Sequence, residues 1–214
     1  ALLGLVETLQ GPARDDAAAR ERFLAIIAGE AARMARLVDD LLSLSRVEAE
    51  ERRRPTARVD LGELAASVAS ALEPLAQRGG TEIRLDLPEG ATVVPGDASQ
   101  LRQVLMNLIE NAVKYGGRGG PVEVHLGPPA DDPALRRRAV RLTVSDRGPG
   151  IPAHHIPRLT ERFYRVDTHR SREVEGTGLG LAIVKHVVNR HRGRLRIDSA
   201  PGQGSRFSVI LPFE

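Results

Sequence analysis

The chain has 214 residues, 41% of them apolar, a formal net charge of +3 and no cysteine. This length fits one large domain or two small ones. The lack of cysteine excludes disulfides and cysteine metal sites, and it suits a cytoplasmic location. Because no run of about 18 apolar residues occurs, we expect no direct membrane insertion by this chain. Aromatic content is 3%, and no recognition-helix pattern adjoins the arginine runs, so no nucleic-acid binding is expected.

The first 51 residues predict a helical hairpin. An apolar helix over residues 1–10 is broken by Gly11-Pro12, and Asp15 or Asp16 caps a second helix that runs to about Glu51. The second helix carries a heptad seam at Phe23, Ile27, Glu30, Met34, Leu37, Leu41 and Leu44, widened by Leu24, Ile26, Val38 and Leu42. We expect a homodimer through this hairpin, with two hairpins forming a four-helix bundle. The alternative is a hairpin packed on the rest of its own chain.

A polar linker is expected over residues 52–58, followed by a second domain over 59–214. Helices are predicted over 61–78, from Asp97 or Ser99 to Tyr115, and over 178–191, with one or two short helices between 147 and 177. Strands are predicted at 59–60, 81–87, 91–95, 121–127, 138–146, 193–200 and 204–211, with Asp131-Asp132-Pro133 in a connection. The expected class is α+β, a two-layer α/β sandwich with a largely antiparallel sheet.

Asn107 and Asn111 lie one turn apart on a predicted helix, so both amides project from one face. Carboxamide oxygens suit Mg²⁺, which prefers oxygen ligands and shares substrate phosphates. Lys114 can reach the same phosphates as a point charge. An exposed helix face is the alternative, but the neighbouring apolar residues indicate a half-buried helix, where unpaired amides are costly. These neighbours are Val104, Leu105, Leu108, Ile109 and Val113.

Asp146 ends an apolar strand and enters the turn Arg147-Gly148-Pro149-Gly150. A carboxylate there can accept a hydrogen bond from an adenine amino group, and Gly148 and Gly150 allow backbone to approach the ring. An ordinary Asp-Gly turn is the alternative.

A glycine loop, Gly176-Thr177-Gly178-Leu179-Gly180-Leu181, leads directly into an amphipathic helix. Free N–H groups at a helix N-terminus favour phosphate. The spacing matches neither a dinucleotide fingerprint nor a P-loop. A flexible hinge is the alternative. The charged segment 169–175 before the loop is expected to be a mobile lid.

Phe163 and Arg165 precede that segment. We expect Phe163 to pack at the base of the lid and Arg165 to contact a γ-phosphate, with a solvated arginine as the alternative. No pair of histidines has a metal-ligand context, and none lies on the hairpin, so we expect surface or core histidines at His125, His154, His155, His169, His186 and His191.

These patterns, in this order after a heptad hairpin, resemble the sensor histidine kinases of two-component systems, whose ATP-binding domain has the histidine kinase/gyrase/Hsp90-like fold. The segments 110–116 and 159–167 most resemble the phosphate-regulon sensor kinases. The resemblance implies a protein histidine kinase, with ATP and Mg²⁺ as cofactors and the receiver domain of a response regulator as partner. It also implies that the chain is the cytoplasmic portion of a bacterial inner-membrane protein.

The resemblance implies a role for each matching residue. Asn111 would bind Mg²⁺ with help from Asn107, and Asp146 would hold adenine. Lys114, Tyr115 and Arg165 would contact the phosphates or the ribose side, with Lys114 and Arg165 as the catalytic residues. The glycine loop, Gly176 to Leu181, would contact phosphate.

The family's acceptor motif, a histidine followed by an acidic residue, would lie before Ala1, so this chain has no phosphoacceptor. We therefore expect it to bind Mg–ATP but not to label itself. Two other readings remain. An ATPase of the same fold would need a catalytic Glu where Asn107 stands, and Asn cannot act as a general base. A non-catalytic docking module with a vestigial pocket would not bind nucleotide.

Overall fold

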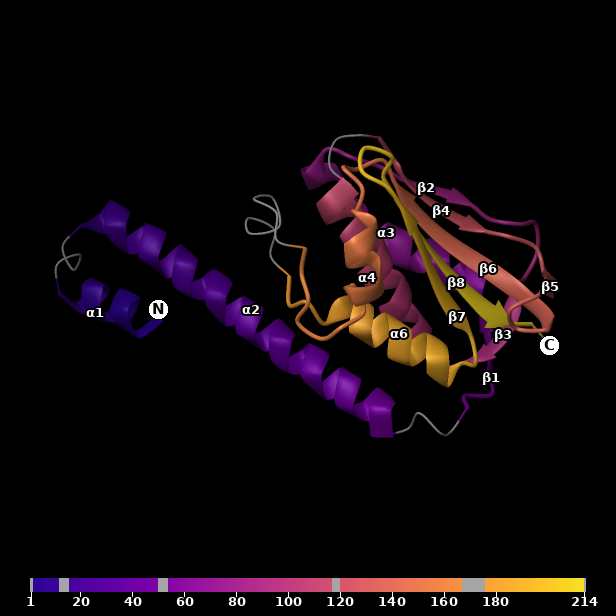
Figure 1. Cartoon of the computed structure of the whole chain (residues 1–214). Helices are drawn as coiled ribbons and strands as arrows, with labels where there is room; N and C mark the ends of the chain where they lie inside the picture. The colour runs from indigo at the N-terminus through magenta and orange to yellow at the C-terminus, as the bar shows by residue number, and fades with distance from the viewer. Residues whose placement is uncertain (1, 12–15, 50–53, 117–119, 167–175, 214) are drawn as a thin grey trace.

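The computed structural model describes residues 2–11, 16–49, 54–116, 120–166 and 176–213. Two helices come first, α1 (Leu2–Gln10) and α2 (Ala17–Ala49). Asp16 caps the second helix, because its Oδ1 accepts a hydrogen bond of 2.9 Å from the Ala19 N–H. The predicted helical hairpin is thus confirmed, and α1 lies beside the N-terminal half of α2 (Figure 1). Among the described residues, no helix combines the length and apolar character that crossing a membrane requires.

The remaining elements follow the predicted order: β1 (Ala57–Asp60), α3 (Leu61–Gly79), β2 (Ile83–Asp86), β3 (Val93–Gly96), α4 (Ala98–Gly116), β4 (Val122–Leu126), β5 (Ala130–Asp132), β6 (Arg137–Asp146), η2 (Ala153–Arg158), α6 (Gly180–Arg190), β7 (Arg194–Ser199) and β8 (Ser205–Pro212). Two predictions need correction. Strand β1 begins at Ala57, inside the expected linker, and β5 is a short strand where a connection was expected, because it pairs with β6. The predicted lid, 169–175, lies outside the described residues.

The main sheet has the strand order β2-β4-β6-β8-β7, and β1 and β3 form a separate antiparallel pair. Among the described strands of this sheet, only the β2–β4 pairing is parallel, and β3 and α4 intervene in the chain between those two strands. The prediction of a largely antiparallel sheet is confirmed.

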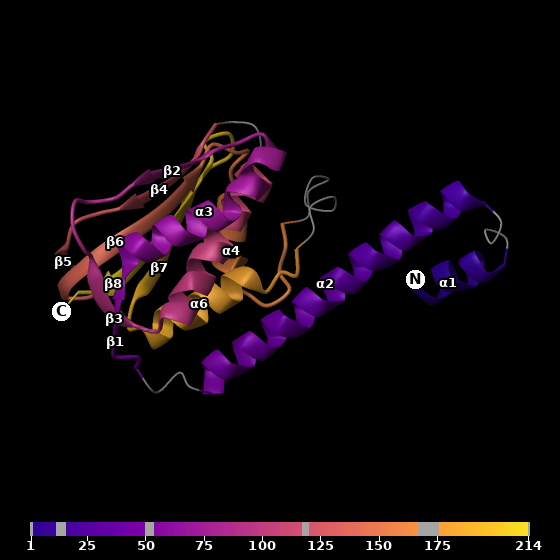
Figure 2. The ribbon, with the colours of Figure 1, turned by 180° about the vertical axis from the view of Figure 1, so that it is seen from behind.

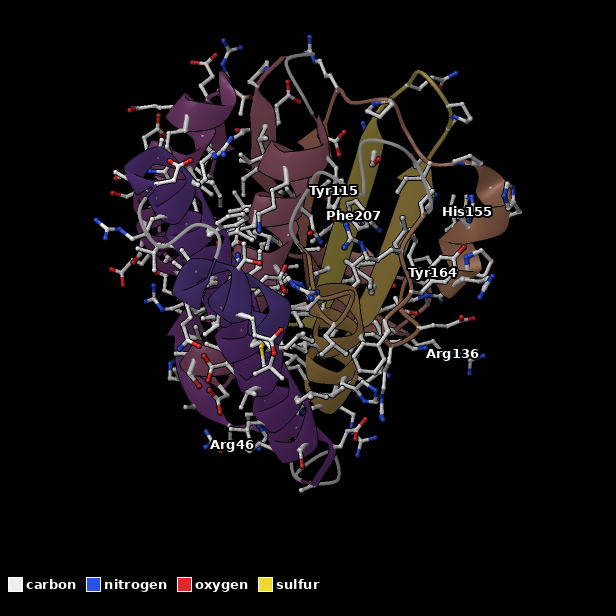
Figure 3. All side chains as sticks on the ribbon, turned by 90° about the vertical axis from the view of Figure 1, so that its left-hand side faces the viewer. Arg46, Tyr115, Arg136, His155, Tyr164 and Phe207 are labelled. Carbon is white, nitrogen blue, oxygen red and sulfur yellow. The ribbon has the colours of Figure 1, made fainter. Side chains whose placement is uncertain are left out.

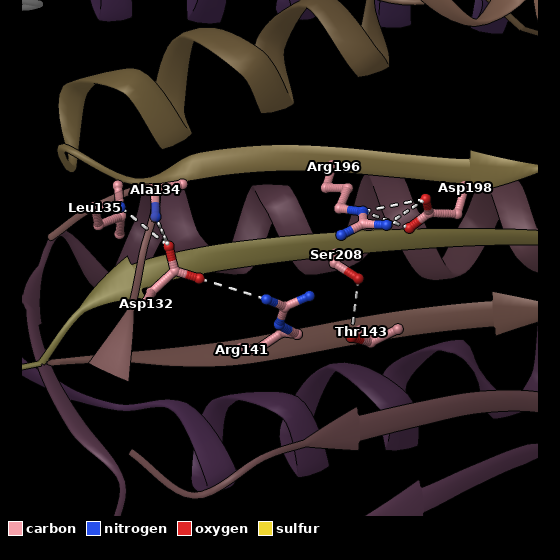
Figure 4. Close-up of polar contacts among 8 residues, drawn as sticks. All are labelled: Asp132, Ala134, Leu135, Arg141, Thr143, Arg196, Asp198 and Ser208. Carbon is pink, nitrogen blue, oxygen red and sulfur yellow. Dashed lines mark hydrogen bonds and ion pairs between the residues drawn. The ribbon is translucent and has the colours of Figure 1, made fainter. Parts of the chain in front are cut away.

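Helices α3, α4 and α6 cover one face of this sheet, which makes the predicted two-layer sandwich (Figure 1). The apolar stripes of the three helices and the inward side chains of the strands form one continuous core. The other sheet face carries polar pairs between neighbouring strands (Figure 4). Among them are Thr143 and Ser208, whose hydroxyl oxygens are 3.1 Å apart, and Arg141 and Asp132, 3.4 Å apart.

The C-terminal half of α2 packs on the sandwich, whereas its N-terminal half extends away from it, as opposite views show (Figure 1, Figure 2). Leu44 and Val47 are 2% exposed within the core, and Leu37 packs against it. Leu44 therefore packs on the sandwich of its own chain, as the alternative describes for this half of α2, whereas Leu37 is only partly buried. The apolar side chains that remain exposed on α2 are Leu24, Ile26, Met34, Val38, Leu41 and Leu42.

A buried histidine ties the end of α6 to the start of α4. His191 is 1% exposed, and its Nε2 accepts a hydrogen bond of 3.0 Å from the Asp97 N–H, while Nδ1 lies 2.8 Å from the Val187 carbonyl. These partners require a neutral ring protonated at Nδ1. Asp97 in turn caps α4 by accepting from the N–H groups of Ser99 and Gln100. The expectation of a core histidine is confirmed here.

This histidine makes the stability of the fold depend on pH. Burial lowers the pKa of His191 below the ordinary value of 6.5. The unfolded chain therefore binds the proton more readily, so stability is complete above about pH 6.5 and falls as the pH drops below it. We expect the free energy of unfolding in denaturant to fall by about 1 kcal/mol or more between about pH 8 and pH 5.5.

The His191→Gln variant should start less stable but lose less stability over this pH range. The control is His154→Gln, since His154 is exposed and should leave the wild-type slope unchanged. A His191→Gln chain with the full wild-type slope would contradict the assignment.

Candidate functional site

A cavity of about 580 Å³ opens between α4, the turn after β6, the glycine loop before α6, and α2. Of the residues predicted to form the site, twelve line this cavity: Asn107, Asn111, Lys114, Tyr115, Asp146, Gly150, Arg165, Gly176, Thr177, Gly178, Gly180 and Leu181. Four segments that are far apart in the sequence therefore converge on one cavity.

The α4 wall presents both predicted amides. Val104, Leu105, Leu108 and Ile109 are buried against the sheet, which turns the opposite face of α4 to the cavity. Asn107 Nδ2 donates a 3.0 Å hydrogen bond to the Gln103 carbonyl. With Nδ2 held in this bond, the side-chain oxygen Oδ1 of Asn107 faces α6. A Cβ at Gly180 would lie 2.6 Å from this oxygen. Gly180 is thus the residue that lets α6 begin beside the amide.

The side chain of Lys114, also on α4, forms an ion pair within the helix. Lys114 Nζ lies 2.6 Å from Glu110 Oε2, one turn earlier on α4, and both side chains are partly buried. Glu110 also lines the cavity. Such a pair orders the lysine side chain, which can then turn its ammonium to an anionic ligand.

Asp146 forms the deep wall at the end of β6. Its Oδ1 accepts a 2.8 Å hydrogen bond from the Gly148 N–H, which fixes the carboxyl group, and burial raises its pKa above the ordinary 3.8. A Cβ at Gly116 would come within 2.8 Å of the Asp146 Cβ, so the end of α4 packs directly on this residue. The Ser205 backbone N–H also hydrogen-bonds this carboxyl group. Each carboxylate oxygen can accept more than one hydrogen bond, so the group can still accept from a donor in the cavity.

The turn after Asp146 is pressed against the β7–β8 turn. Gly150 has φ +70°, and a Cβ there would lie 1.9 Å from the Ala200 carbonyl oxygen, so only glycine fits. Gly150 lines the cavity as predicted, whereas Gly148 does not. Gly148 acts on the site through its N–H to Asp146.

The glycine loop also lines the cavity. Arg165 donates a 3.0 Å hydrogen bond to the Gly176 carbonyl, and a Cβ at Gly176 would lie 3.2 Å from the Tyr115 hydroxyl. Leu179 is fully buried in the core and anchors the loop rather than lining the cavity. Its N–H donates to the Thr177 hydroxyl at 3.3 Å.

The lid against which Phe163 was expected to pack lies outside the described residues, so that prediction stays untested. Phe163 is 58% exposed and lies outside the cavity wall, and its φ of +62° is unusual for a side chain of this size. Its N–H donates to the Gly178 carbonyl at 2.9 Å, and Gly178 itself has φ +73°. Phe163 therefore positions the loop through its backbone.

Several lining residues were not predicted. Phe207 of β8 lines the cavity together with the predicted Tyr115 of α4, and Tyr164 reaches His155, with 2.5 Å between Tyr164 Oη and His155 Nδ1 (Figure 3). Flat apolar walls of this kind suit a ring system. The unpredicted lining residues include Met106, Ile151, Leu159, Tyr164 and Phe207, and four residues of α2, namely Arg33, Arg36, Asp39 and Asp40. For the α2 residues no sequence signal existed, because only the docking of α2 brings them here.

Comparisons with known proteins agree with this geometry. Residues 96–214 match the family described as "Histidine kinase-, DNA gyrase B-, and HSP90-like ATPase". The phosphate regulon sensor protein PhoR of Pseudomonas aeruginosa is 39% identical over 207 residues, which cover 97% of this chain and 45% of PhoR. The sensor-like histidine kinase SenX3 of Mycobacterium tuberculosis is 38% identical over 210 residues, or 97% of this chain and 48% of SenX3. The chain spans about half the length of these relatives.

Solved structures show the same similarity. Full-length ShkA in complex with AMPPNP has a TM-score of 0.73 at 30% identity, covering 92% of this chain and 39% of ShkA. The family match includes α4, the Asp146 turn and the glycine loop. The chain therefore belongs to the histidine kinase-, DNA gyrase B- and Hsp90-like ATPase family, as the ATP-binding catalytic portion of a two-component sensor histidine kinase.

Proposed function

We propose that the cavity binds Mg–ATP and delivers the γ-phosphoryl group to a histidine in another segment of a parent kinase, from which an aspartate of a response-regulator receiver domain takes it. One observation carries the proposal: Asn107, Asn111, Asp146 and Gly178 line a single cavity. Its volume of about 580 Å³ suits a nucleotide.

The donor set fits magnesium. Asn107 and Asn111 each offer a neutral oxygen from one face of α4, and the ion usually takes its other ligands from water and from substrate phosphates. When bound, Mg²⁺ would neutralise charge on the phosphates. We assign Asn111 as the principal ligand and Asn107 as its assistant.

The base end of the nucleotide would lie at Asp146. Its carboxylate, fixed by Gly148, can accept a hydrogen bond from the adenine amino group, and the Gly150 turn leaves space for the ring. A guanine base has a carbonyl oxygen at that position, which the carboxylate would repel. The site thus favours adenine.

The phosphate end would lie between α4 and the glycine loop. Lys114 and Arg165 supply cationic donors, Tyr115 supplies a hydroxyl, and the N-terminus of α6 at Gly180 supplies free N–H groups. Phosphoryl transfer needs chiefly positioning and charge neutralisation, which these residues provide. Lys114 and Arg165 are therefore the residues to which we assign catalysis.

The remaining functions are those of the parent protein. The exposed apolar residues of α2, such as Ile26 at 48% and Val38 at 55% exposure, support a homodimer in which a second hairpin covers them. The similarity to PhoR, a phosphate regulon sensor protein, supports phosphate-responsive signalling. We propose that the parent is a bacterial inner-membrane sensor whose cytoplasmic portion includes this chain.

The magnesium assignment predicts a metal-dependent defect. Asn111→Ala should weaken binding of a non-hydrolysable ATP analogue by on the order of tenfold or more at saturating Mg²⁺, because one metal ligand is lost. Titration calorimetry with and without chelator measures the effect. The control is Asn189→Ala on α6, where Asn189 is exposed and away from the cavity. Unaltered affinity in Asn111→Ala would show that the metal assignment is wrong.

The adenine assignment predicts a pH dependence. Because burial raises the pKa of Asp146, its carboxylate begins to take a proton at a higher pH than an ordinary aspartate, and the protonated form loses an acceptor. We expect wild-type affinity for the analogue to fall as the pH drops toward this raised pKa. Asp146→Asn should bind on the order of tenfold more weakly at neutral pH and lack this step.

Subtracting the two profiles removes the titration of the nucleotide's own phosphates. The matched control is Asp198→Asn, which lies on the outer sheet face beside Arg196. Parallel pH profiles for wild type and Asp146→Asn would refute the role of Asp146.

A further inference from the structure

The C-terminal half of α2 docks on the sandwich through a single face. Asp40, Ser43, Leu44, Val47 and Glu48 follow the spacing of one helical stripe. Leu44 and Val47 are buried, and the Ser43 hydroxyl lies 2.7 Å from Gln103 Oε1 on α4. This stripe is separate from the exposed apolar side chains at Val38, Leu41 and Leu42.

The docked stripe holds the two loops that flank the cavity. Glu48 accepts from Arg162, just before Phe163, and lies 3.4 Å from His186 of α6. Eight residues earlier on the same stripe, Asp40 Oδ2 accepts a 2.6 Å hydrogen bond from the Thr177 hydroxyl. Thr177 is in the glycine loop, and its hydroxyl also accepts from the Leu179 N–H. A carboxylate of α2 is thus fixed against the loop assigned to phosphate.

The negative charge of Asp40 disfavours phosphate binding at the glycine loop. Asp40 lines the cavity and is less exposed than its neighbour Asp39. A triphosphate at the glycine loop would lie close to this carboxylate, and like charges a few ångströms apart at a partly buried site repel strongly. The nearby Arg33 of α2 is already paired with Glu30 of the same helix at 3.1 Å. The matched family region begins at residue 96, so α2 contributes this charge from outside it.

We propose that Asp40 lowers the affinity of the cavity for nucleotide, and we call this residue the latch. Asp40 holds the glycine loop through Thr177, and its charge competes with the triphosphate. Docking of α2 and binding of Mg–ATP therefore oppose each other. This inference rests on the proposed function. By thermodynamic linkage, whatever undocks α2 raises nucleotide affinity, and nucleotide favours the undocked helix to the same extent.

The first experiment compares two single variants with wild type. Asp40→Asn removes the charge but leaves a side chain of the same shape, and it should tighten binding of Mg–ATP analogue by on the order of threefold to tenfold in calorimetry. Glu21→Gln is the control, because it removes a charge from an exposed position of the same helix that does not line the cavity. It should change affinity by less than about twofold. Equal or weaker binding by Asp40→Asn than by wild type would overturn the latch.

The second experiment clamps the helix. The chain has no cysteine, so Glu48→Cys with His186→Cys provides the two thiols for a short bis-maleimide cross-linker. Neither residue lines the cavity. The linked protein should bind the analogue several-fold more weakly than the unlinked double variant, and adding Asp40→Asn should remove most of that difference.

Equal affinity of the linked and unlinked forms would also overturn the latch while leaving the proposed function intact. If wild type and every variant fail to bind the analogue, although circular dichroism shows that they are folded, the proposed function itself is wrong.

Discussion

The site depends on how α4 is packed. One stripe of this helix, which includes Leu105, Leu108 and Ile109, is almost fully buried between the sheet and its neighbouring helices. Each such side chain contributes about 1.5–3 kcal/mol by leaving water. Rotating the helix by one residue would expose several of them and bury Asn107 and Asn111 without partners, at further cost. The core therefore fixes the direction in which the two amides point.

Close backbone contact completes the cavity. Gly150 packs on the β7–β8 turn and Gly180 lies beside the Asn107 amide, at distances that no side chain allows. These glycines bring the Asp146 turn and the glycine loop to the wall made by α4. The packing of α4 fixes the direction of the amides, and the glycines fix the positions of the two loops. The shared cavity needs both.

Much of this could be predicted from the sequence, because periodicity and turn residues are local signals. The bounds of α3, α4 and β6 follow from apolar spacing and from caps such as Asp97. Strand β5 was missed, because three polar residues form a strand only through pairing with β6. The docking of α2 on its own chain was kept only as an alternative to the dimer. Leu44 fits a heptad seam and a contact with the sandwich equally well, and only the tertiary structure decides between them. Asp40 and Phe163 depend on that same tertiary arrangement, so their positions could not be read from spacing.

The most direct measurement is a crystal structure of the chain with Mg²⁺ and a non-hydrolysable ATP analogue. Our account predicts the metal at about 2.1 Å from Asn111 Oδ1, the adenine amino group within hydrogen-bond distance of Asp146, and the phosphates beside Gly178. A nucleotide bound elsewhere, or bound in this cavity with its phosphates at Asp146, would contradict it.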